Sequence, residues 1–133
     1  MKLALLTVIV AGFAMNSMAQ KALIYKEGSK FGLKTDFDKE LLPPDCDTIF
    51  KIVTPEFDFY VADEDGSSTM YSYLTDKREL FDETTGTDFT QIRVEYSKDK
   101  TTSNIVGIDK LGNKFKHLEE GGWGPIKSKS KLG

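Results

Sequence analysis

The sequence has few of the residues that small enzymes and metalloproteins use for chemistry. Its 133 residues include one cysteine, Cys46, and one histidine, His117. A single cysteine excludes an intramolecular disulfide, although an intermolecular one stays open. The flanking carboxylates of Asp45 and Asp47 raise a thiol pKa, so we interpret Cys46 as a small apolar residue at a strand start rather than a nucleophile. A lone histidine disfavours a zinc site, and we expect His117 on a strand surface.

The chain also lacks an excess of positive charge. Its 18 lysine and arginine residues face 21 aspartate and glutamate residues, which gives a formal net charge of −3 and a pI near 5.2. Such a chain exerts no long-range attraction on phosphates, so nucleic-acid binding is disfavoured. The length suits one domain with one hydrophobic core.

Long apolar runs are missing except at the N-terminus. Met1-Lys2 give a positive start, residues 3–14 (LALLTVIVAGFA) are apolar, and Ser17-Met18-Ala19 supply small residues. This pattern predicts a helical, bacterial-type secretory signal peptide over residues 1–19, cleaved between Ala19 and Gln20, because the run is too short to span a membrane. An N-terminal core strand or an uncleaved anchor is the alternative. We expect an exported protein, periplasmic or extracellular, with no transmembrane span after cleavage.

Turn-forming residues interrupt the remaining chain at short intervals, and no window of helical period is longer than a few residues. Apolar residues between the turns alternate with polar ones, as they do on the two faces of a strand. The pattern predicts an all-β domain of antiparallel hairpins over residues 20–126 and a Lys- and Ser-rich solvated tail over residues 127–133. The expected strands cover residues 22–25, 30–34, 40–42, 46–53, 57–62, 69–74, 78–81, 92–96, 104–109 and 114–118, with Pro43-Pro44 ending the third.

The order of strands and turns recurs about three times. Gly32, Ser72 and Gly107 occupy corresponding places, at spacings of 40 and 35 residues that are typical of stacked repeats. The first copy runs from Lys30-Phe31-Gly32-Leu33 through Pro43-Pro44 to Asp47-Thr48-Ile49. It resembles the WG-repeat (KWG-repeat) family, whose pattern is roughly K-W-G-L-I-D, a turn, V-I-P-P and Y-D-x-I. Residues 106–115 match the first strand and turn but lack the prolines.

This resemblance implies a short array of β-repeats or a twisted meander, and an interaction role without a defined partner. In the middle copy Tyr71-Ser72 replaces the aromatic-Gly pair, so that copy rests on element order. The literal Trp123-Gly124 could open a truncated fourth unit or cap the array. An aromatic ring beside a residue without a Cβ is a packing device. An exposed binding platform is the other interpretation, with Trp123 and Phe31 as its candidates.

Two further groups of residues are candidates for chemistry. Asp63 and Asp65, in a stretch that continues with Gly66, form a weak Ca²⁺ candidate, but an EF-hand needs an oxygen ligand at Val61 and a carboxylate at Ser72. A solvated hairpin turn is the favoured interpretation, because Asp-Gly is itself a strong hairpin signal. A triad of His117, Glu119-Glu120 and a serine lacks a nucleophile elbow and an oxyanion hole.

No residue pattern names a cofactor, and none is expected. The sequence therefore favours an exported, non-enzymatic binding module of the cell envelope, whose partner is a protein or a glycan. The alternative is a small secreted glycan-active hydrolase that uses a carboxylate pair.

Overall fold

The computed structural model describes residues 22–126; the predicted signal peptide and tail lie outside this range. Within it the regular elements are β-strands, and all paired neighbours are antiparallel, which confirms the all-β prediction. The strands are β1 (Ala22–Glu27), β2 (Lys30–Thr35), β3 (Glu40–Cys46), β4 (Thr48–Val53), β5 (Asp58–Glu64), β6 (Ser67–Leu74), β7 (Glu79–Asp82), β8 (Phe89–Tyr96), β9 (Ser103–Asp109), β10 (Lys114–His117) and β11 (Trp123–Pro125).

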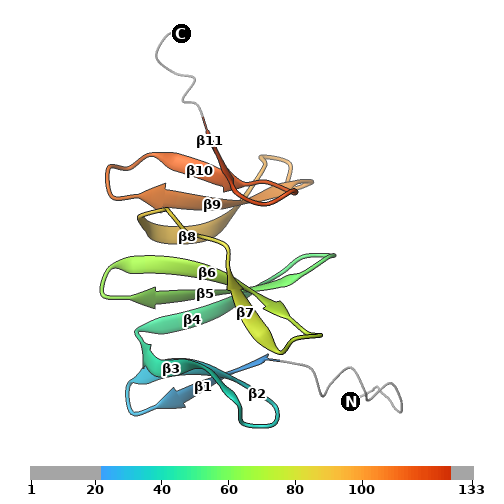
Figure 1. Ribbon diagram of the computed structural model, residues 1–133. Coiled ribbons are helices and arrows are strands. Elements are labelled where there is room, and N and C mark those ends of the chain that lie inside the picture. Colours follow the sequence, from blue (N-terminus) through green and yellow to red (C-terminus); the bar gives the residue numbers. More distant parts are fainter. Residues whose placement is uncertain (1–21, 127–133) are drawn as a thin grey trace, which may run out of the picture.

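The strands form three separate meanders. The first sheet has the order β1-β2-β3, the second β4-β5-β6-β7 and the third β8-β9-β10-β11. Figure 1 shows the three sheets stacked as layers, with the first at the bottom and the third at the top. Each sheet follows the chain order without a crossover, so the stack is assembled from local hairpins.

The second sheet is buried on both faces because it is the middle layer. Along β5 the side chains alternate, so that Tyr60 and Ala62 face the first sheet while Phe59 and Val61 face the third. All four are at most 5% exposed, and this accounts for the nearly continuous apolar run of residues 57–62. Leu33 of the first sheet and Ile92 of the third complete the two interfaces.

The sequence misplaced the end of the third strand and the start of β8, which begins at Phe89 rather than at residue 92. Pro43-Pro44 does not end the third strand, because β3 continues through both prolines to Cys46. The strand lies at an edge of its sheet, where a missing N–H costs no ladder bond, and its pairing with β2 shifts register between Phe31 and Leu33. Cys46 therefore closes β3 rather than opening the next strand, and it is 5% exposed.

Aromatic rings lie directly over two glycines. A Cβ on Gly32 would come within 2.7 Å of the Leu42 carbonyl oxygen and 2.9 Å of the Tyr25 ring, and one on Gly107 within 2.5 Å of the Phe89 ring. The rings come from neighbouring strands rather than from the residue beside the glycine. These close approaches need residues without a side chain. The sequence predicted glycine as a packing position but assigned the rings to Phe31 and Trp123, whereas Tyr25 and Phe89 make the contacts.

We expect Gly107→Ala to lower the free energy of unfolding by about 1–3 kcal/mol, because the added methyl group collides with the Phe89 ring in a filled core. Gly124→Ala is the matched control, since its Cβ would lie 3.3 Å from the mobile end of Leu118 and should cost less. Denaturant unfolding of both variants measures the difference. Equal losses would show that the Phe89 contact does not limit residue size at position 107.

Candidate functional site

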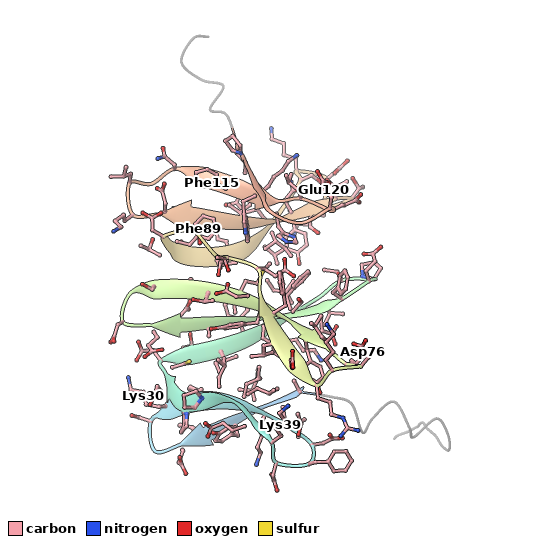
Figure 2. The ribbon with its side chains drawn as sticks, viewed as in Figure 1. Lys30, Lys39, Asp76, Phe89, Phe115 and Glu120 are labelled. Carbon is pink, nitrogen blue, oxygen red and sulfur yellow. The ribbon has the colours of Figure 1, made fainter. Side chains whose placement is uncertain are left out.

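A groove of about 1,100 Å³ separates the second and third sheets on one side of the stack. It begins at the C-terminal half of β4 and the turn that leads to β5. Its opposite wall is made by β8, β9 and the turn between β10 and β11, where Glu120 is labelled in Figure 2. Ile52, Phe59, Val94 and Ile105, which belong to or pack on the core between these sheets, also line it. The groove is the outward continuation of that core.

Exposed apolar side chains are concentrated in this groove. Of the ten large hydrophobic residues that are exposed within residues 22–126, five line it: Phe50, Val53, Phe57, Phe81 and Tyr96. The exposed fractions of Val53 and Tyr96 are 69% and 66%. Scattered exposed hydrophobic residues are ordinary, whereas a contiguous apolar patch marks a binding surface.

A polar cluster forms the floor of the groove at the point where the two sheets meet. The Glu83 carboxylate lies 3.2 Å from Nε2 of His117 and accepts a 2.8 Å hydrogen bond from the Ser72 hydroxyl. The side chains of Glu83 and His117 are only 14% and 12% exposed. The expectation that His117 lies on a surface is therefore wrong. Its partner is Glu83 rather than Glu119 or Glu120, and no sequence spacing indicated that pairing.

The order of groups in this cluster is not that of a nucleophilic triad. A triad places the imidazole between the hydroxyl and the carboxylate, so that the base can take the hydroxyl proton. Here the carboxylate stands between them, and the Ser72 hydroxyl donates to Glu83 instead. Ser72 is also 3% exposed. The cluster joins β6, the segment after β7 and β10, which makes it a tie between layers.

Trp123 takes part in the same tie. Its indole N–H donates a 2.8 Å hydrogen bond to the Glu83 carbonyl, and its ring makes edge contacts with Phe89 and His117 at centroid distances of 4.8 and 5.0 Å. The His117 ring in turn meets Phe59 at 5.3 Å. Trp123 is half-buried beside the groove but is not among the residues that line it. Its role as a binding platform stays a prediction.

Phe31, the other platform candidate, lies elsewhere. It is half-buried and packs against the core between the first and second sheets. Lys26 places its ammonium 5.7 Å from the ring centroid. The structure thus separates Phe31 from Trp123 by the whole middle layer, and the two do not form one surface.

The Asp63 and Asp65 pair is organised by hydrogen bonds. The Asp63 carboxylate accepts from the hydroxyls of Thr48, at 3.0 Å, and Ser68, while the Asp65 backbone N–H donates to Asp47 at 3.1 Å. Asp65 and Gly66 have positive φ angles of 50° and 81° and connect β5 directly to β6 as a two-residue hairpin turn. Within residues 22–126 no group of three or more Asp, Glu, His or Cys side chains could hold a metal ion.

Cys46 is buried between the first two sheets. Burial raises the pKa of its thiol, and the carboxylates of Glu64, Asp45, Asp47 and Asp63 raise it further. The prediction of a raised thiol pKa in an apolar position is confirmed, and Cys46 is a packing residue.

The charges of the groove are unevenly paired. Its two basic residues are both engaged: Lys51 lies 3.5 Å from Asp58, and Arg93 lies 2.6 Å from Glu95. Arg93 and Lys114 together lower the pKa of the Glu95 carboxyl. Three acidic residues of the lining, Glu56, Glu119 and Glu120, form no ion pair within the described chain. Within residues 22–126 these three carboxylates therefore give the rim of the groove an excess of negative charge.

We expect Glu83→Leu to lower the free energy of unfolding by about 1–3 kcal/mol, because it leaves the Ser72 hydroxyl and the His117 ring without their partner at a buried position. Glu83→Gln should cost less, since an amide can still accept from Ser72. Denaturant unfolding of the two variants tests the tie. A fully stable Glu83→Leu protein would contradict it.

Within the described chain there is no helix that is long and apolar enough to cross a membrane. The groove combines exposed aromatic rings, a polar floor that joins the layers, and an acidic rim. No known protein family, curated protein or solved structure matches this chain.

Proposed function

We propose that the protein is an exported, non-enzymatic binding module of the cell envelope, built from WG-like β-repeats, and that the groove between its second and third sheets receives the partner. The observation that carries this proposal is the concentration of exposed aromatic and aliphatic side chains in one groove. Apolar surface of this kind is stabilised when a partner removes it from water.

The repeat part of the proposal is supported by similar local structure in distant parts of the chain. At Thr35 and at Asp109 a side-chain oxygen accepts the backbone N–H groups of the residues two and four positions ahead. In both turns the backbone N–H of the first residue also donates to the carbonyl four positions ahead. Gly32, Ser72 and Gly107 are all buried. Similar turns beside buried small residues are what degenerate copies of one unit retain.

We assign no catalytic role to the groove because its buried polar groups form hydrogen bonds with one another. The carboxylate at the floor is held by a hydroxyl and an imidazole in an order that does not activate the hydroxyl. A glycan-active hydrolase needs instead a pair of carboxylates fixed across the substrate. Glu83 has a structural task, so the proposal assigns recognition rather than turnover to the groove.

Export is tested by the mass of the mature protein. We expect the intact mass of the product recovered from the periplasm or medium to correspond to a chain that starts at Gln20, because the segment before it has the three parts of a cleavable signal peptide. A replacement of Ala19 by a large residue serves as the control and should block cleavage. Recovery of a chain that retains residues 1–19 would overturn the proposed localisation.

Binding through the groove is tested by capture from an envelope extract with the immobilised mature chain. We expect the double variant Phe57→Ser/Tyr96→Ser to lose capture by about tenfold or more, since truncating a central interface aromatic costs about 1 kcal/mol or more. Leu111→Ser is the matched control: Leu111 is 82% exposed but lies in the β9–β10 turn, outside the groove. Equal capture by both variants would show that the groove is not the binding surface.

A further inference from the structure

The geometry points to an extended polypeptide segment, in which basic and apolar side chains alternate, as the ligand of the groove, and we propose that it binds by adding a strand to the free edge of β4. This inference rests on the proposed binding function and names its partner. Three observations carry it: an unpaired strand edge in the groove, apolar side chains on both sides of that edge, and an acidic rim.

β4 is an end strand of the second sheet and pairs only with β5 within the described chain. Four consecutive β4 residues, Phe50 to Val53, line the groove. Since side chains of a strand alternate between faces, consecutive residues reach the same space only when the edge of the strand borders it. The edge of β4 therefore opens into the groove.

The pattern of hydrogen bonds between β4 and β5 identifies which backbone groups of β4 do not pair with β5. The Thr54 N–H donates to the Phe57 carbonyl at 2.9 Å, and the register pairs Ile52 with Phe59 and Phe50 with Val61. Because antiparallel partners exchange hydrogen bonds at every second residue, Phe50 and Ile52 direct their backbone groups at β5. Lys51 and Val53 direct theirs into the groove. A strand needs this spacing of donors and acceptors to pair with a new chain.

Three of the other end strands carry features that oppose added strands, whereas the remaining two, β1 and β8, contain neither proline nor glycine. β3 contains Pro43-Pro44, β11 is a three-residue strand that ends in Pro125, and β7 has only four residues. Prolines and short strands are the usual protection of an exposed edge. β4 (TIFKIV) has neither proline nor glycine, and its one charged residue, Lys51, is paired with Asp58. This edge is both apolar and unprotected.

The charge of the groove selects the polar side chains of the ligand. Glu56, Glu119 and Glu120 line it without ion pairs within residues 22–126, whereas Lys51 and Arg93 are already neutralised. A strand bound beside β4 would direct alternate side chains at the apolar walls and at this rim. Lysine or arginine at the rim-facing positions complements the carboxylates, and acidic residues there are repelled.

The test uses a synthetic heptapeptide, capped at both ends, in which lysine alternates with valine or phenylalanine. Binding to the mature chain is measured by fluorescence anisotropy. Two further peptides carry N-methyl groups, one on each of the two alternating sets of amides. In strand addition only one set pairs with β4, so we expect one methylated peptide to bind about tenfold or more weakly and the other to bind like the parent. Equal binding of all three would overturn pairing with β4.

The charge component has its own controls. Glu119→Gln/Glu120→Gln should weaken the lysine peptide about threefold to tenfold at low salt, whereas Glu79→Gln, exposed on β7 outside the groove, should not. A peptide with glutamate in place of lysine should bind least. Tight binding of that peptide, or displacement of the lysine peptide by a neutral cello- or chito-oligosaccharide, would overturn the proposed ligand class.

The two proposals fail separately. If Phe57→Ser/Tyr96→Ser abolishes capture from the envelope extract while the lysine peptide does not bind the wild-type chain, the groove is the binding surface and the peptide inference is wrong. If capture is unchanged in that variant, the groove itself is excluded.

Discussion

Burial of the middle sheet on both faces is the constraint on which the structure depends. A two-layer arrangement buries one face of each sheet, so its strands alternate apolar and polar residues. β5 instead buries four residues in succession, two against each neighbouring layer. The outer sheets need only one apolar face each, and β2 (KFGLKT) accordingly alternates Phe31 and Leu33 with lysine and glycine. The stack thus depends on close contact between layers, and within the outer sheets aromatic rings of neighbouring strands lie directly on Gly32 and Gly107.

The same arrangement explains the groove. Rows of apolar side chains hold the layers together through the centre of the stack, but hairpins extend beyond that centre at the side where β4 turns into β5 and β10 turns into β11 (Figure 1). There the core between the second and third sheets continues outward, and no further strand of residues 22–126 covers it. Phe57, Phe81 and Tyr96 are exposed for that reason. The apolar surface is therefore exposed because the hairpins of the second and third sheets do not meet at this side of the stack.

Most of the fold could be predicted from local patterns. Alternation and turn residues placed nearly every strand, because a meander is built from hairpins whose turn chemistry is written in adjacent residues such as Asp65-Gly66. The prediction that Pro43-Pro44 ends the third strand was wrong because a proline is tolerated on an edge strand. Sequence alone does not reveal which strands are edges. Trp123 and Phe31 were recognised as aromatic residues beside glycine, yet which layers they join depends on the stacking.

The candidate site was largely hidden from sequence analysis for the same physical reason. Its floor joins Ser72, Glu83 and His117, which are 11 and 34 residues apart along the chain, and its walls come from five strands. No short-range pattern encodes contacts between layers. His117 looked like a surface residue because its strand alternates, although the alternate face here meets another sheet.

The polar floor and the apolar walls also depend on each other. Glu83 binds Ser72 and His117 through its carboxylate and Trp123 through its carbonyl, so one residue fixes β6, β10 and β11 where the layers begin to separate. A purely apolar contact could slide or collapse to cover Phe57 and Tyr96, because dispersion and burial have little directional preference. Hydrogen bonds to buried partners are directional, and breaking them to close the groove would leave polar groups unpaired. The tie therefore favours an open groove in the free protein, and a partner of the proposed kind would meet a surface that is already formed.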